Sequence, residues 1–112
     1  MDREAAIPEI VRRLVEYYKP ERIYLFGSVA RGEAGPDSDL DFCVVLPDDA
    51  PKELYGGRIH SALSRWGIYT AMDIIPFPAT EFDLRAAHVV SSLPATVVQE
   101  GRIVYDARRV AA

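Results

Sequence analysis

Two short apolar segments, joined by a polar loop, constrain the fold of this chain more than any other feature. The first, Arg22–Phe26, runs directly into a Gly-Ser pair at Gly27–Ser28. After ten intervening residues the second opens with Asp-Leu-Asp at Asp39–Asp41 and continues as an apolar run to Leu46. Short apolar runs bounded by glycine, proline and aspartate are typical of buried strands. The stretch therefore predicts two strands whose connection carries polar groups suited to binding.

The spacing of apolar residues elsewhere predicts helices that alternate with strands. The expected elements are a helix at Ile7–Lys19, a strand at Arg22–Phe26, a short helix at Ser28–Gly32, a strand at Asp39–Leu46, a helix at Lys52–Trp66, a strand at Ile68–Ile75, helices at Thr80–Val90 and Pro94–Glu100, and a strand at Arg102–Tyr105. We expect a single domain over residues 1–112 of the α+β class (mixed α/β). In it a small mixed sheet of three to four strands carries helices packed on it.

Several residues indicate where these elements begin, bend or end. Ser28 is a good N-cap for the short helix, and Thr80 opens a variant of the capping box. The pair Gly56–Gly57 weakens its helix by about 1 kcal/mol per glycine relative to alanine, so that helix is expected to start late or bend. Pro76 and Pro78 are expected to end the third strand.

The aspartates at the start of the second strand point to a metal site. Residues two apart share a face, so Asp39 and Asp41 lie together while Leu40 and Phe42 face the core. Carboxylates about 6 Å apart repel by about 3 kcal/mol at an effective dielectric of about 20, and a divalent cation reverses that sign. Hard oxygen ligands suit Mg²⁺. Asp73, in an apolar strand, would join the site if its strand pairs beside the second. There it would serve the attacking hydroxyl of a two-metal centre.

The Gly-Ser pair points to phosphate binding. Glycine at Gly27 lets the backbone approach a phosphate closely, and free amides at a helix start, with the Ser28 hydroxyl, bind phosphate oxygens. Arg31 lies one turn further on and either contacts phosphate or forms a structural ion pair. Ser38 adjoins the aspartates and is either a turn residue or a further phosphate contact.

Composition narrows the class of protein. A net charge of −4 argues against nonspecific nucleic-acid binding, which needs a cationic surface. The single cysteine, Cys43, excludes an intramolecular disulfide. No apolar run approaches the roughly 20 residues that span a bilayer, and the N-terminal residues lack the apolar core of a signal peptide. We therefore expect a cytoplasmic protein without membrane contact.

The spacing of Gly-Ser, ten residues and Asp-x-Asp in GSVARGEAGPDSDLDF resembles the signature of the nucleotidyltransferase superfamily that includes DNA polymerase beta. Its compact form is similar to that of the minimal nucleotidyltransferases, or MNT proteins, and the resemblance extends from the first helix to EGRIVYD. The resemblance implies transfer of AMP from ATP with Mg²⁺, two ions being expected. It implies catalytic and metal-binding roles for Asp39, Asp41 and Asp73, and nucleotide-binding roles for Gly27, Ser28, Arg31 and Ser38.

The resemblance also implies a partner. Many MNT proteins resemble MntA-type antitoxins, which pair with an all-helical HEPN ribonuclease toxin and adenylylate one of its tyrosines. We therefore expect a protein adenylyltransferase that forms a hetero-oligomer with a HEPN-type toxin. The short segment after Pro78 favours an acceptor that a partner supplies rather than a second domain.

Other interpretations stay open from the sequence. The chain could neutralise its partner by occlusion, with the carboxylates present as remnants or as structural groups. It could also transfer the nucleotide to a small molecule, whereas the acidic charge disfavours an RNA end. Taken singly, Asp39 and Asp41 are also compatible with solvated residues at a strand entry, and Asp73 with a salt bridge. Packing is the expected role of Cys43, and the two histidines lack metal-ligand spacing.

Overall fold

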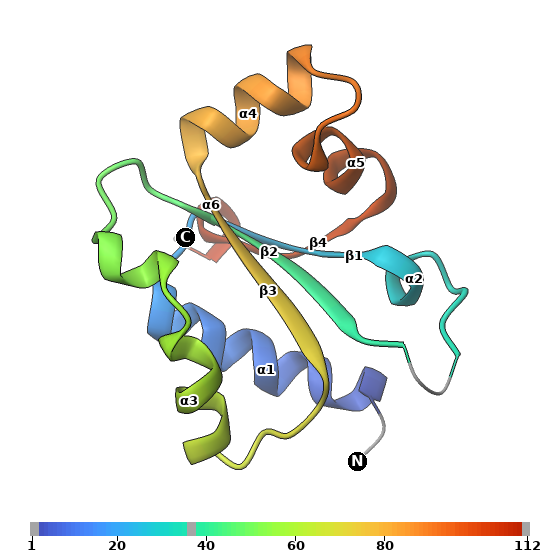
Figure 1. Ribbon diagram of the computed structural model, residues 1–112, viewed down its shortest axis with the longest axis vertical. Helices are drawn as coiled ribbons and strands as arrows, with labels where there is room; N and C mark the ends of the chain where they lie inside the picture. Colours follow the sequence, from blue (N-terminus) through green and yellow to red (C-terminus); the bar gives the residue numbers. More distant parts are fainter. Residues whose placement is uncertain (1–2, 36–37, 111–112) are drawn as a thin grey trace.

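A four-stranded mixed sheet runs through the centre of the molecule, with helices on both of its faces (Figure 1). The structure, a computed structural model, describes residues 3–35 and 38–110. Its elements in chain order are α1 (Arg3–Tyr18), β1 (Arg22–Phe26), α2 (Gly27–Ala30), β2 (Leu40–Leu46), the 3-10 helix η1 (Lys52–Tyr55), α3 (Arg58–Arg65), β3 (Met72–Pro78), α4 (Ala79–His88), α5 (Leu93–Glu100), β4 (Arg102–Asp106) and α6 (Ala107–Val110). The α+β class and the mixed sheet expected from the sequence are confirmed.

The strands lie in the order β3-β2-β1-β4. β1 runs antiparallel to both β2 and β4, whereas β2 and β3 run parallel. Parallel neighbours need a crossover connection, and η1 with α3 supplies it between β2 and β3. The crossover places the starts of β2 and β3 at the same end of the sheet.

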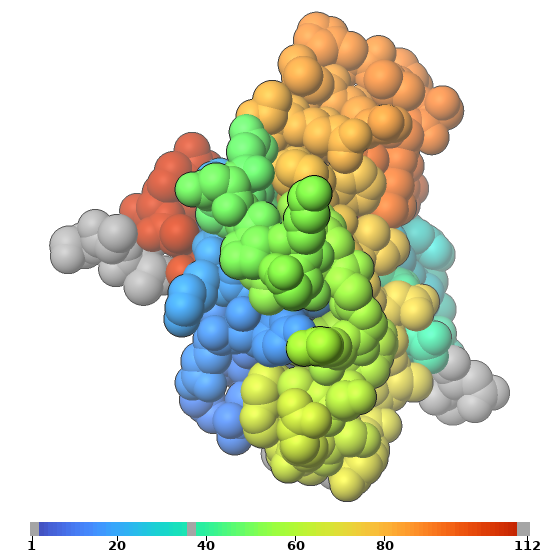
Figure 2. Space-filling model, turned by 60° about the vertical axis from the view of Figure 1, so that its left-hand side comes forward, coloured from blue at the N-terminus to red at the C-terminus, as the bar shows by residue number. Residues whose placement is uncertain are grey.

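β2 divides the hydrophobic core into two layers, because successive side chains of a strand point to opposite faces. The even-numbered residues of Leu40–Leu46 join α1 and α3 in the larger cluster. The odd-numbered Cys43 and Val45 join Phe82 of α4 and Val97 of α5 in the smaller one. In the space-filling view the segment around α4, in orange, projects from the rest of the molecule (Figure 2). The smaller layer thus supports a helical lobe over one part of the sheet only.

The third strand differs from the sequence-based prediction. β3 begins later than the predicted strand at Ile68–Ile75 and continues through both Pro76 and Pro78. The Leu40 N–H donates to the Ala71 carbonyl at 3.1 Å, and in a parallel pair the residues that bond the neighbour alternate. The prolines therefore occupy positions whose missing N–H would face the open edge. The prediction that proline ends this strand was wrong because an edge strand tolerates proline at such positions.

The short helix α2 also begins and ends earlier than predicted. Its first residue is Gly27, and its last is Ala30 rather than Gly32. The N-cap position belongs to Phe26, which makes no side-chain capping bond. Ser28 is the second residue of the helix and is not its cap, because β1 passes directly into α2 without an intervening residue.

The remaining elements agree more closely with the sequence. α1 begins four residues before the predicted start at Ile7 and ends one residue before Lys19. The predicted helix at Lys52–Trp66 is divided into η1 and α3, and Gly56–Gly57 lies between them, as the glycine pair indicated. Helix α5 and strand β4 lie within one residue of their predicted bounds, and the short helix α6 that follows was not predicted.

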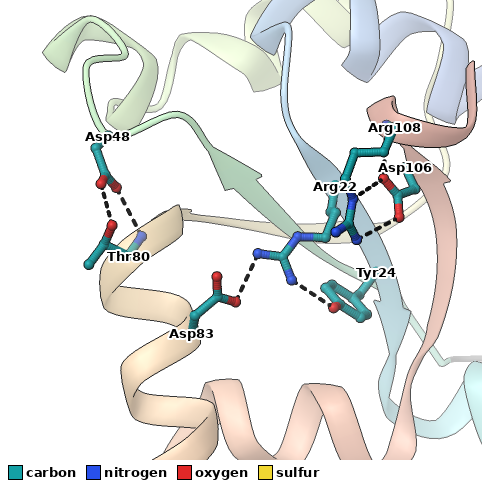
Figure 3. Close-up of polar contacts among 7 residues, drawn as sticks. All are labelled: Arg22, Tyr24, Asp48, Thr80, Asp83, Asp106 and Arg108. Carbon is teal, nitrogen blue, oxygen red and sulfur yellow. Dashed lines mark hydrogen bonds and ion pairs between the residues drawn. The ribbon is translucent and has the colours of Figure 1, made fainter. Parts of the chain in front are cut away.

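A side chain from a distant loop caps α4. The Thr80 N–H donates to Asp48 Oδ1 at 2.9 Å, and the Thr80 hydroxyl donates to the other carboxylate oxygen (Figure 3). These bonds hold the pKa of the Asp48 carboxyl below its usual range. The predicted capping box was wrong, because Asp83 turns away to pair with Arg22 of β1 at 2.9 Å.

The cysteine and the two histidines differ in their burial. Cys43 is buried, and burial raises the pKa of its thiol to about 12. His60 and His88 are exposed on α3 and α4. Within residues 3–35 and 38–110, no helix combines the length and apolar character needed to cross a membrane.

We expect Gly101→Ala to lower the free energy of unfolding by about 1–3 kcal/mol, since overpacking against backbone is difficult to relax. A Cβ at Gly101 would lie 2.6 Å from the Val97 carbonyl oxygen and 2.8 Å from that of Leu25. Gly56→Ala is the matched control, because its Cβ would lie at an ordinary 3.5 Å from the Glu53 carbonyl oxygen. Urea unfolding of both variants measures the difference, and equal stabilities would contradict the close approach.

Candidate active site

The candidate site lies at the end of the sheet where β1 turns into α2. Gly27 adopts a φ of 79° at this turn, in the left-handed region that favours glycine. A Cβ at Gly27 would overlap Oδ2 of Asp41. The glycine is therefore required both by backbone conformation and by the space that the carboxylate occupies. The sequence suggested this residue only as an approach for phosphate.

Asp41 and Asp73 lie directly opposite each other on parallel strands. The register of the sheet pairs Asp41 with Asp73 on one side and with Phe26 on the other. Residues in register point to the same face, so the two carboxylates share the face that carries Cys43. The pairing of β3 beside β2, on which a role for Asp73 depended, is therefore present.

The surroundings of Asp41 raise the pKa of its carboxyl group above the ordinary value. Desolvation is the largest cause, followed by the negative charges of Asp73 and Asp39, while Arg31 acts in the opposite direction. Asp73 also acts on Asp41 through a hydrogen bond that favours the protonated form. Two carboxylates that share one place favour a proton or a cation between them.

Asp39 stands apart from this pair. β2 begins at Leu40, one residue later than predicted, so Asp39 precedes the strand and is exposed. Among the described residues, no group of three or more Asp, Glu, His or Cys side chains is arranged to hold a metal ion. Asp41 and Asp73 nevertheless fit a divalent cation, because their oxygens are hard ligands and a cation would relieve their repulsion. Asp41 and Asp73 are therefore already placed to bind a cation, whereas Asp39 contributes negative charge nearby.

Ser28 and Arg31 have different surroundings. Ser28 is half-buried and is the second residue of α2, at the end of the sheet that carries the carboxylates. Arg31 pairs with Glu33 at 3.1 Å and with Glu100 of α5 at 3.3 Å. Of the two interpretations that the sequence left for Arg31, the structure contains the ion pair.

Ser38 has a turn contact and an unexpected partner. Its hydroxyl accepts the Gly35 N–H at 3.0 Å, and its carbonyl oxygen accepts Nη1 of Arg3 at 2.6 Å. Sequence reasoning missed both Arg3 and Glu100. No local pattern signals them, because their partners lie 35 and 69 positions away along the chain.

Residues 7–102 match the family model described as "Nucleotidyltransferase domain". This chain belongs to that family. The matched range contains every candidate site residue, namely Gly27, Ser28, Arg31, Ser38, Asp39, Asp41 and Asp73. The chain therefore carries a nucleotidyltransferase domain, and its class is that of a transferase.

Among solved structures, the nucleotidyltransferase is similar to chains of toxin–antitoxin crystal structures. One complex, with AMP-PNP, has a TM-score of 0.57 at 20% identity and covers 89% of this chain and 73% of that chain. An MntA-HpeT mutant with two aspartates changed to glutamate gives 0.56 at 17%, covering 91% and 75%. An MntA-HpeT mutant with a tyrosine changed to alanine gives 0.56 at 23%, covering 92% and 75%. These TM-scores show a shared fold. Comparison with curated proteins finds no match.

Gly27→Ala should damage the nucleotidyltransferase more than Gly32→Ala. Both glycines have left-handed φ values, 79° and 74°, so both variants carry a backbone cost of about 1–3 kcal/mol. Among the described residues, the new methyl group meets a neighbour, Asp41, at Gly27 and none within 4 Å at Gly32. Thermal unfolding and nucleotidyl transfer measured on both variants make the comparison. Equal losses would show that the contact with Asp41 is unimportant.

Asp41→Asn should raise the Tm of the metal-free nucleotidyltransferase at neutral pH. The folded pKa of Asp41 lies above the unfolded value, so deprotonation of this group costs folding free energy. The advantage of the variant should be full above the folded pKa and should vanish as the pH falls below the ordinary value of 3.8. Asp49→Asn, at an exposed loop position, is the control. An advantage that grows on acidification would contradict the raised pKa.

Proposed function

We propose that this nucleotidyltransferase transfers AMP from ATP to a hydroxyl, that of a tyrosine, on a HEPN-type ribonuclease toxin and thereby acts as its antitoxin. The observation that carries the proposal is the Asp41–Asp73 pair, in register on parallel strands and packed against a glycine that leaves it room. We include in the proposal that residues 1–112 form one domain and that the protein is cytoplasmic.

The donor half of the reaction rests on the residues around the Gly-Ser pair. The backbone at Gly27 and Ser28 would receive phosphate oxygens of ATP, with Ser38 at the opposite end of the loop. Arg31 would contact phosphate only after leaving Glu33 and Glu100, so its proposed role is the weaker one. Phosphate binding through backbone amides suits a site whose side chains are acidic.

The acceptor half rests on the three carboxylates. Asp39, Asp41 and Asp73 would hold Mg²⁺, two ions in the full site, which when bound neutralises phosphate charge and lowers the pKa of the attacking hydroxyl. Asp73 would orient that hydroxyl and accept its proton. The hydroxyl oxygen bonds to the α-phosphorus, the bond from that phosphorus to the bridging oxygen breaks, and pyrophosphate leaves.

The solved structures support the choice of partner. The fold is shared with chains from toxin–antitoxin complexes, one of which contains AMP-PNP. Two further structures are MntA-HpeT mutants that replace two aspartates or a tyrosine, the residue types that the proposal uses as metal ligands and as acceptor. This similarity supports a toxin partner, and the HEPN type and the tyrosine acceptor follow from the resemblance of the motif.

One observation favours a second candidate, neutralisation by occlusion. Among the described residues, Asp39 forms no three-membered group of metal ligands with Asp41 and Asp73, which is the arrangement expected of a metal site that has lost its function. A small-molecule acceptor is a further alternative that keeps the chemistry. Growth of cells that express the toxin together with a catalytically dead chain separates occlusion from transfer. Incubation of the isolated chain with small hydroxyl compounds and ATP addresses the small-molecule acceptor.

The double variant Asp39→Ala, Asp41→Ala should lose AMP transfer by more than about 100-fold, since removing a group that only hydrogen-bonds a metal ligand already costs about 10–100-fold. The assay incubates the chain with α-labelled ATP, Mg²⁺ and a HEPN-type protein from the same genome, and mass spectrometry locates the added AMP. Asp49→Ala is the control for removal of an acid. Retained transfer in the double variant refutes the proposal, and retained neutralisation without transfer favours occlusion.

A further inference from the structure

The two acids of the Asp-x-Asp motif are held in different ways. Asp41 lies within β2, where neighbouring strands flank it through Phe26 and Asp73. Asp39 precedes the strand and is not paired with a neighbouring strand. Its position depends on whatever fixes the peptide groups on either side of it.

The peptide group that follows Asp39 is fixed by the sheet. The Leu40 N–H donates to the Ala71 carbonyl oxygen at 3.1 Å. The peptide group that precedes Asp39 is fixed by a side chain, because the Ser38 carbonyl oxygen accepts Nη1 of Arg3 at 2.6 Å. Asp39 is therefore held between one backbone bond and one arginine.

Arg3 holds more than a single carbonyl group. Its Nη1 also donates to the Gly35 carbonyl oxygen at 3.1 Å. Gly35 and Ser38 are joined to each other, since the Ser38 N–H donates to the Gly35 carbonyl at 3.2 Å and the Gly35 N–H donates to the Ser38 hydroxyl at 3.0 Å. One guanidinium nitrogen thus contacts both Gly35 and Ser38, the described residues on either side of positions 36–37.

The other end of this connection is rigid. Arg3 is the first residue of α1, and Ile7, Ile10 and Leu14 of the same helix are buried in the larger core cluster. Nε of Arg3 is itself buried and has no partner among the described residues. Burying a guanidinium with an unsatisfied donor is unfavourable, so the contacts of Nη1 are obtained at a cost.

We propose that Arg3 is a positioning residue for Asp39: it anchors the carbonyl group of Ser38, directly before the Asp-x-Asp motif, to the core helix α1 and so sets the first carboxylate for metal binding. The inference rests on the proposed function for the role of Asp39. It adds a residue that lies outside the motif and acts through the Ser38 carbonyl group.

The test compares Arg3→Ala and Arg3→Lys with Arg12→Ala in the full chain. Arg12 belongs to the same helix and pairs only with Glu9 and Glu16 among the described residues, so its removal controls for loss of an arginine from α1. Three quantities are measured for each variant: Mn²⁺ affinity by electron paramagnetic resonance, the Tm, and kcat and KM for AMP transfer from ATP.

Arg3→Ala should weaken Mn²⁺ binding and lower kcat by about 10-fold, the size of effect seen when a group that orients a metal ligand is removed. Its KM for the acceptor and its Tm should stay close to those of Arg12→Ala. Arg3→Lys keeps a donor for the Ser38 carbonyl and should fall between wild type and Arg3→Ala. It also carries the test if Arg3→Ala fails to fold.

Two results would overturn the role of Arg3. One is equal Mn²⁺ affinity in Arg3→Ala and Arg12→Ala or, where Arg3→Ala does not fold, an Mn²⁺ affinity of Arg3→Lys equal to that of wild type. The other is a loss of affinity that simply follows Tm across the series, which would indicate a structural role. A wild-type chain that binds Mn²⁺ but transfers no AMP contradicts the proposed function instead, and the Mn²⁺ comparison then still decides on Arg3.

Discussion

The in-register pairing of Asp41 with Asp73 is the constraint around which the candidate site is arranged. A sheet that pairs two acids in register and partly desolvates one of them incurs a free-energy cost, visible in the raised pKa of Asp41. The buried residues of β2 behind the pair, Leu40 and Phe42, hold the strand in place against that cost. The molecule therefore keeps a locally unfavourable arrangement, as functional sites commonly do, and a proton or a cation would relieve it.

The parallel pairing of β2 and β3 determines where this cost falls. Asp41 and Asp73 are each the second residue of their strands, so strands that start at the same end of the sheet bring them together. A hairpin would instead have set the start of β3 against the end of β2. The crossover through η1 and α3 thus has a chemical consequence besides closing the larger core. The same end of the sheet receives Gly27, where β1 stops, and the three features meet there.

Much of this could be predicted from the sequence, because the decisive patterns are local. Strand alternation placed Leu40 and Phe42 in the core, and the Gly-Ser and Asp-x-Asp spacing predicted a nucleotidyltransferase. Several of the failures depend on contacts with parts of the chain that are distant in sequence. Thr80 is capped by Asp48 from a loop 32 positions away, and Pro76 is tolerated because β3 lies at an edge. Arg3 could not be predicted, since only the folded α1 brings it to Ser38.

The charges of the site restrict the order in which ligands can bind. Asp39, Asp41 and Asp73 are three acids, and the arginine that opposes them, Arg31, is already engaged by Glu33 and Glu100. The described surroundings of the carboxylates are therefore anionic, and they would repel a nucleoside triphosphate that carries no bound cation. If ATP is the donor, as proposed, it has to bind together with cations or after them. Glu100 belongs to α5, so a helix outside the motif also determines how much positive charge Arg31 can offer to the nucleotide.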